Sequence, residues 1–340
     1  MRDGLLRISA EHLLSWDSGL AASLWEHLAP LQRQQVALDF SALPEGLRAV
    51  LEQALSPQTP AASAVGSAND AAGATRAGAL ATLQRKLHEG WQDALTTAAF
   101  LGEVLLALGR LARGRTDMRG ADLLRQIDQT GPLSVPIVSL TCFLVGLMLA
   151  YMGGAQLHRI GAQNYIADVV TVGMVREIAG LMTGVILSGR LGAAFAAQLA
   201  SMQANEEIDA LRALGVDPIS YLVLPRLLAL LLVAPLLIAV AATVGVLAGM
   251  LAAVGIYGVP PAEYLNKCLK ALTWTHLWIG LFKGTLYAGL VALAGCREGL
   301  HAGRNAQAVG LATTSAVVKA LVWIISAACA TTVFFQSLGF

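Results

Sequence analysis

The segment Gln203-Ala-Asn-Glu-Glu-Ile-Asp-Ala-Leu-Arg-Ala-Leu-Gly-Val-Asp-Pro218 is a short polar stretch between two long apolar runs. The run before it, 178–205, carries a single charge, Arg190, and the run after it, 227–262, carries none. About 20 apolar residues are enough to cross a bilayer as a helix. The pattern therefore predicts membrane-spanning helices on both sides of a compact acidic segment that lies at a membrane surface.

The composition of the whole chain supports an integral membrane protein. Of its 340 residues, 56% are hydrophobic and only 13% are charged, whereas soluble domains have about 25% charged residues. The net charge of +1 gives no indication of a nucleic-acid partner. The four cysteines form no CxxC pair, so neither a disulfide framework nor a metal site is expected.

Motifs for nucleotide binding and hydrolysis are missing from the sequence. It contains no GxxxxGK[ST], HExxH or GxSxG pattern. We therefore expect no catalytic residues and no cofactor. The energy for any transport must come from an ion gradient or from a partner subunit.

The chain divides into three parts by composition. Residues 1–55 are predicted to form a small α/β unit, with strands at 5–8 and 35–40 and helices at 18–28 and 46–55. Residues 56–79 are rich in Ala, Ser, Gly and Pro, which predicts a flexible linker. Residues 80–340 form the membrane part.

The membrane part begins with an amphipathic stretch over 80–112. Apolar residues recur at helical spacing from Leu80 to Leu108, while Arg85, Lys86 and Asp93 occupy the other faces. This pattern favours a helix that lies in the membrane interface. The alternative is an ordinary helix that packs on the soluble unit.

Five membrane-spanning helices are predicted within 133–338. They lie near 133–156, 169–199, 224–257, 272–294 and 309–338. The loops on one side carry nine Lys and Arg residues against three on the other, which places the N-terminus in the cytoplasm and the C-terminus on the far side. The expected fold is thus a mainly α polytopic membrane protein with an interfacial helix, about five transmembrane helices and a small α/β cytoplasmic unit.

Several charged residues fall inside the predicted spans, where charge is expensive and side chains usually pair or face a cavity. Arg176 and Glu177 are either part of a polar substrate cavity or a structural ion pair. Arg190 is a candidate for the same cavity or an anchor for neighbouring helices. Lys283 either snorkels or contacts lipid headgroups.

Small residues are spaced for close helix packing in the same spans. Gly245 and Gly249 form one GxxxG pair, and Gly280 and Gly284 form another. Helices in lipid approach closely where such residues meet. We expect helix–helix contacts at these glycines.

The acidic segment 203–217 is expected to be a short helix. Acids in its first turns suit the helix dipole, and Gly215 and Pro218 end it. It either docks a soluble partner or is a well-capped loop. The candidate docking residues are Glu206, Glu207, Asp209, Leu211, Arg212 and Asp217.

Several ordered motifs of the chain resemble the MlaE/YrbE-type family of ABC transporter permeases. Two departures are clear: Glu177-Ile-Ala-Gly180 replaces the family's Glu-Leu-Gly-Pro, and Ala197-Gln-Leu-Ala200 replaces its Ala-Glu-Ile-Gly. The resemblance covers about residues 80–340. The matching segments are 175–198, 202–218, 224–226, 282–284 and 310–318.

The resemblance implies a homodimeric permease in a bacterial inner membrane that moves phospholipid or a related lipid between the membranes of a diderm envelope. Two cytoplasmic ATPase subunits would grip the 203–217 segments, and a periplasmic MCE-domain protein would exchange lipid on the far side. Arg176 and Glu177 would lie near the lipid cavity. Residues 36–41 weakly resemble part of a STAS domain, which the N-terminal unit would contain in truncated form.

Two other classes of function stay open on the residues alone. An ion-coupled secondary transporter usually has more spans, internal repeats and broken helices, and the sequence shows neither repeats nor a chain of acids in its spans. A non-transporting scaffold would recruit a partner through residues 1–55.

Overall fold

The computed structural model describes residues 5–9, 24, 28, 37–43, 74–114 and 118–339. The chain forms two compact units, Met1–Leu83 and Gln84–Phe340. In the first, strand β1 (Leu5–Ser9) pairs in parallel with β2 (Ala37–Ala42), with Leu5 opposite Ala37. Both predicted strands are therefore present.

Other predictions for the N-terminal part fall mostly outside the described residues. The helix expected at 18–28 is described only at Leu24 and Leu28, which are helical, and the helix expected at 46–55 is not described. The α/β unit as a whole and its resemblance to a STAS domain thus stay predictions. The linker boundary is corrected: α3 already begins at Ala74, inside the expected 56–79 linker, where alanines favour helix.

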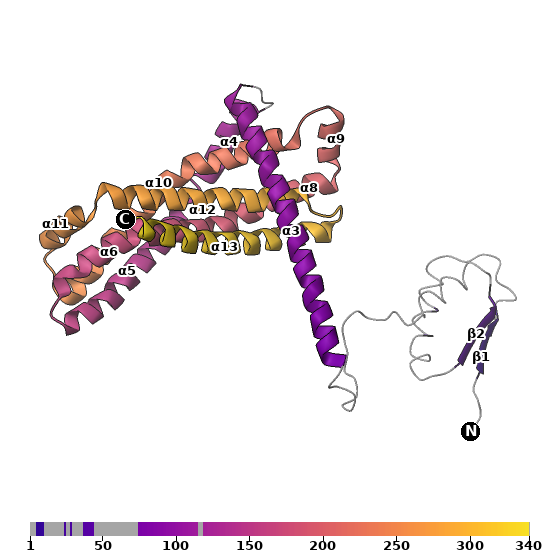
Figure 1. Cartoon of the computed structure of the whole chain (residues 1–340), viewed down its shortest axis with the longest axis horizontal. Helices are drawn as coiled ribbons and strands as arrows, with labels where there is room; N and C mark the ends of the chain where they lie inside the picture. Colours follow the sequence, from indigo (N-terminus) through magenta and orange to yellow (C-terminus); the bar gives the residue numbers. More distant parts are fainter. Residues whose placement is uncertain are drawn as a thin grey trace. The chain divides into compact units, whose positions relative to one another are not determined.

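The second unit is built from helices alone among its described residues. Helix α10 packs against α5 and α12, and α12 and α13 both pack against α8. In Figure 1, α10, α12 and α13 lie side by side. The helices are α3 (Ala74–Ala112), α4 (Gly120–Thr130), α5 (Val135–Arg159), α6 (Ile166–Gly173), α7 (Ala179–Leu187), α8 (Ala193–Ala204), α9 (Glu207–Ala213), α10 (Leu224–Tyr257), α11 (Pro261–Ala271), α12 (Trp274–Leu300) and α13 (Ala306–Ser337).

Six helical segments of the described chain, rather than five, are long and apolar enough to cross a membrane. Five correspond to the predicted spans, and α10 begins and ends at the predicted 224 and 257. The sixth is Gly90–Ala112, the main part of α3. Helix α3 runs across the long axes of α12 and α13 rather than alongside them (Figure 1). That α3 lies in the membrane interface stays a prediction, and the crossing orientation of α3 (Figure 1) favours it.

The second span is one continuous helical segment, Gln163–Ala204, with two π-helical turns in it. The first turn, Met174–Ile178, contains Arg176 and Glu177, and the second, Ser188–Gly192, contains Arg190. Such turns add a residue to the helix and often occur at functional sites. Arg176, Glu177 and Arg190 therefore lie in the two turns where the helix changes from α-helical to π-helical hydrogen bonding.

Close approach at glycine brings the second span into contact with both the third and the fourth. A Cβ atom on Gly280 would lie 1.9 Å from the carbonyl oxygen of Val175, and one on Gly180 would lie 3.0 Å from the Cα of Gly284. A Cβ on Gly245 would lie 2.1 Å from the Met174 side chain. The expectation of close helix contacts at the GxxxG glycines is confirmed.

Candidate functional site

A buried lysine and a partly exposed carboxylate form the centre of a polar cluster inside the spans. Lys283 on α12 has a side chain only 1% exposed, and its Nζ lies 2.5 Å from Oε1 of Glu177. Lys283 also donates to the hydroxyl of Thr332 on α13 at 3.0 Å, and that hydroxyl lies 3.3 Å from the other oxygen of Glu177. Three helical segments thus meet at one ion pair.

The cluster extends to Arg176, the residue before Glu177, and to His276 on α12 and Phe335 on α13. Nε of Arg176 lies 3.7 Å from Oε1 of Glu177, and its guanidinium approaches Nδ1 of His276 at 3.5 Å. The ammonium of Lys283 also lies 5.8 Å from the ring centre of Phe335. The structure therefore brings together three of the four predicted cavity residues.

Arg190 lies apart from this cluster. Its guanidinium donates to the hydroxyl of Ser134, just before α5, at 2.6 Å. It follows Glu177 by about 20 Å along the helix, at about 1.5 Å per residue. Arg190 therefore ties the second span to α5, which agrees with the interpretation as an anchor between helices.

Exposure differs between the two partners of the central ion pair. The Glu177 side chain is 37% exposed, so its carboxylate reaches the surface of the span while Lys283 stays covered. A buried cation needs a counter-ion, and Glu177 supplies it to Lys283. Arg176, 16% exposed, offers a second cation on the same turn.

The acidic segment forms the short helix α9, bounded by two residues in the left-handed region. Glu206, with φ 59°, precedes the helix rather than lying in its first turn. Gly215, with φ 78°, follows it, and its N–H donates to the carbonyl of Arg212 while that of Val216 donates to Leu211. These bonds form a C-terminal capping motif that satisfies the last carbonyls. The predicted stop at Gly215 is confirmed.

Helix α9 is attached to its surroundings by ion pairs at both ends. Arg304, in the loop after α12, lies 2.7 Å from Asp209 and 3.7 Å from Glu206. On the other side Arg110, in the last turn of α3, lies 2.8 Å from Asp217. Asp217 is also a cap for the next helical turn, since it accepts from the N–H of Ile219 at 3.2 Å.

The remaining surface of α9 is exposed. Ile208 is fully buried and anchors the helix, and Leu211 packs against the core in part. Glu207 and Arg212 are exposed, and Leu214 is 79% exposed. An anchored helix with an exposed apolar tip and exposed charges is a surface on which a soluble partner can dock.

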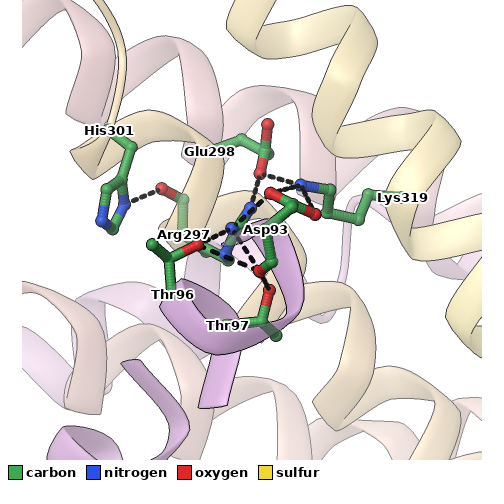
Figure 2. Close-up of polar contacts among 7 residues, drawn as sticks. All are labelled: Asp93, Thr96, Thr97, Arg297, Glu298, His301 and Lys319. Atoms are coloured by element: carbon green, nitrogen blue, oxygen red, sulfur yellow. Dashed lines mark hydrogen bonds and ion pairs between the residues drawn. The ribbon is translucent and has the colours of Figure 1, made fainter. Parts of the chain in front are cut away.

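A third charged cluster, which the sequence alone does not predict, joins α3 to α12 and α13 (Figure 2). The guanidinium of Arg297, 5% exposed, contacts Asp93 at 2.6 Å, the hydroxyl of Thr96 at 2.8 Å, and the carboxylate of Glu298. Lys319 lies 3.0 Å from Asp93 and 2.9 Å from Glu298. Asp93 had been assigned only to the polar face of an amphipathic helix, and no local pattern marks its partners.

The chain is similar to known permeases over most of its length. The family model described as Permease MlaE matches residues 123–334. A probable ABC transporter permease protein of Synechocystis is 34% identical over 238 residues, which cover 69% of this chain and 88% of that protein. A probable ABC transporter permease protein of Rickettsia typhi is 35% identical over 203 residues, covering 60% and 78%.

A plant relative is similar over a comparable length. The protein trigalactosyldiacylglycerol 1, chloroplastic, of Arabidopsis thaliana is 32% identical over 246 residues, covering 72% of this chain and 69% of that protein. The chain belongs to the MlaE family of ABC transporter permeases. It is a multi-pass membrane protein, and its family implies an ATPase partner.

Proposed function

We propose that the chain is the membrane subunit of an ABC transporter that moves phospholipids or related lipids between the inner and outer membranes. A separate cytoplasmic ATPase drives it, and two copies of the chain form the permease. A periplasmic MCE-domain protein delivers or receives the lipid. The chain itself hydrolyses nothing.

The observation that carries this proposal is the exposed helix α9, anchored on both sides. Arg304 ties α9 to the loop between α12 and α13, and Arg110 ties the residues after it to α3. A movement that an ATPase imposes on α9 would therefore pass to three helices. A loop without such ion pairs would move without displacing the other helices.

The side on which the ATPase docks follows from the charge bias of the loops. The segment 203–217 and the loop after α12 lie on the side that carries most Lys and Arg, which is the cytoplasmic side of an inner membrane protein. The N-terminus lies on this side in the proposal, and the C-terminus lies on the periplasmic side.

Lipid as the transported substrate is supported by the plant relative, whose name contains a glycerolipid, and by the cluster at Glu177. Arg176 and Lys283 lie within the apolar spans, where a lipid headgroup would need cationic partners. We propose that these three residues contact the headgroup. Arg190, bonded to Ser134, shapes the same span without touching the lipid.

The proposal is tested by copurification of the chain with a coexpressed ABC ATPase subunit from the same organism. Wild type should retain the ATPase, whereas Glu206→Ala/Glu207→Ala/Asp209→Ala should lose it or lose lipid-stimulated ATP hydrolysis. Because Asp209 also holds Arg304, a second variant is needed. Leu214→Asp changes only an exposed tip, and it should weaken ATPase binding by at least about tenfold, as truncations at interface centres do.

The matched control is Glu103→Ala/Asp128→Ala, which removes two exposed acids outside α9. The control should behave like wild type. If no ATPase copurifies with wild type, or if all variants retain it equally, α9 is an ordinary loop and a secondary transporter becomes the better explanation.

A further inference from the structure

An open cavity of about 670 Å³ lies between α4, the end of α8 and the beginning of α10. Its volume is in the range of small-molecule sites, about 300–1,000 Å³. Its lining is mixed: Met202, Leu222 and Pro225 are apolar, whereas Gln126, Gln129 and Gln198 offer amide groups. None of the interpretations of the Glu177 cluster or of α9 accounts for this cavity.

Arg226, in the wall of this cavity, is a buried cation without a counter-ion among the described residues. The residue is 7% exposed. Its Nη1 donates to the carbonyl of Leu222 at 2.6 Å, and its Nη2 donates to the amide oxygen of Gln198 at 3.3 Å. Its Nε has no hydrogen-bond partner, and no carboxylate of the described residues forms an ion pair with it.

Leaving this charge uncompensated is unfavourable, because a buried ion that is not paired destabilises the fold by several kcal/mol. The contacts of Arg226 are a carbonyl, a carboxamide and the ring of Phe195 at 5.9 Å, all of them neutral. No negatively charged group among these contacts therefore balances the positive charge of Arg226.

The cavity carries a second arginine and only one acid. Arg125, exposed on α4, also lines the cavity, and Asp122 lies one turn before it on the same helix. Neither of them has an ion-pair partner within residues 74–114 and 118–339. With Arg226 the lining has a net charge of +1, from two arginines and one aspartate. Guanidinium groups bind phosphate oxygens in a planar, bidentate way.

The position of the cavity favours the phosphate of a lipid over a free anion. Ser201 and Met202 lie just before the acidic segment and Leu222 just after it, so the cavity opens at the predicted cytoplasmic end of the spans. In the predicted orientation the phosphates of the cytoplasmic leaflet would lie at this level, and Leu124 on α4 is 68% exposed. A phosphate there would sit beside Arg226 while its acyl chains follow the spans.

We infer that this cavity binds the phosphate group of a membrane lipid on the cytoplasmic side, with Arg226 and Arg125 as its cationic partners. The site is separate from the Glu177 cluster. Gln198 lies about 30 Å further along the same helical segment than Glu177, at about 1.5 Å per residue. The inference does not depend on the direction of transport or on the identity of the ATPase.

The test uses the full chain in a maltoside detergent, which has no phosphate, and phosphatidylglycerol with a photoreactive diazirine in its headgroup. After illumination, mass spectrometry locates the label. We expect it in the peptides that contain residues 120–130 and 197–202. The yield should fall about tenfold in Arg226→Gln, as expected for a lost charged hydrogen bond, and less in Arg125→Gln.

Three further variants separate binding from folding and from the proposed function. Ser201→Trp fills the cavity from an exposed position and should abolish labelling even if Arg226→Gln does not fold. Arg113→Gln removes an exposed arginine outside the cavity and should label like wild type. Lys283→Met, outside the cavity, should leave the label in the peptides with residues 120–130 and 197–202 unchanged, whatever it does to labelling near Glu177 or to transport.

Two results would overturn the inference. Equal labelling of wild type and Ser201→Trp would mean that the lipid binds elsewhere. Loss of labelling in the presence of millimolar inorganic phosphate would identify a free anion, rather than a lipid, as the ligand. Persistence of labelling under the same phosphate concentration supports the lipid.

Discussion

Arg110 and Asp217, 107 residues apart in the chain, form an ion pair of 2.8 Å that joins the end of α3 to the residues after α9. Asp217 serves two purposes there. One of its oxygens accepts the N–H of Ile219, and the other binds Arg110 and the hydroxyl of Ser220. The same carboxylate thus starts the third span and connects it to the helix that crosses the bundle.

Two substitutions of Asp217 separate these purposes. Asp217→Asn keeps an oxygen for the cap but loses the ion pair, and it should cost less than about 1 kcal/mol because the pair is partly exposed. Asp217→Ala also loses the cap, which costs about 1 kcal/mol more. Thermal unfolding in detergent measures both. Equal melting temperatures for the two variants would mean that Asp217 does not cap the helix.

The Glu177–Lys283 pair should behave as a coupled unit. Glu177→Gln leaves a buried ammonium without its carboxylate and should destabilise the protein by about 3–5 kcal/mol. Lys283→Met should cost less, because Glu177 is partly exposed and can be hydrated. The double variant Glu177→Gln/Lys283→Met should be more stable than Glu177→Gln alone.

Melting temperatures of the four proteins provide the double-mutant cycle. Thr332→Val is a useful control, since it removes a hydroxyl that contacts both partners without removing a charge. Strictly additive effects of the two charge substitutions would contradict the coupling.

The sequence predicted those parts of the fold that depend on local pattern. Helix α10 covers the range 224–257 within which the third span was predicted, since length and hydropathy alone decide a span. The stop of α9 at Gly215 follows from glycine's access to positive φ. The ion-pair interpretation of Arg176 and Glu177 was also correct in part, since the two lie 3.7 Å apart.

Local sequence patterns could not predict which residues far apart in the chain form pairs. Lys283 and Thr332 reach Glu177 from other helices, and Asp93 meets Arg297 across 204 residues of chain. The two π turns were also missed, because one extra residue in a helix leaves no signature in hydropathy. Tertiary contacts decide each of these features.

The predicted orientation in the membrane can be tested with single cysteines. Cys142, Cys268 and Cys296 are buried, and burial also raises the pKa of the Cys268 thiol, so these three should not react. In a Cys329→Ser background, an impermeant maleimide added outside the cell should label Lys270→Cys. It should label Leu214→Cys only after the membrane is permeabilised.

Both test positions are exposed, so a lack of reaction reports the membrane barrier and not burial. Reversed labelling would place α9 outside the cytoplasm and exclude a cytoplasmic ATPase as its partner. Labelling of both positions from the outside would show that the membrane is not intact. A cysteine-containing intracellular protein in the same cells serves as the control, because it is labelled only when the membrane leaks.

Gly280 offers a test of how helix packing supports the charged cluster. A methyl group on Gly280 would lie 1.9 Å from the carbonyl oxygen of Val175, which is in the π turn that holds Glu177. Gly280→Ala must therefore push α12 away from that turn, and overpacking of this kind costs about 1–3 kcal/mol. Because Lys283 is on the same helix, its contact with Glu177 should weaken as well.

Gly189→Ala is the matched control, because a methyl group there meets no atom within 4 Å and Gly189 is also in a span. Its melting temperature should equal that of wild type or exceed it, since Ala is the better helix former. Gly280→Ala should melt lower, and adding Glu177→Gln to it should cost less than in wild type, because the ion pair is already weakened. Equal stability of the two glycine variants would mean that α12 can shift without disturbing the π turn.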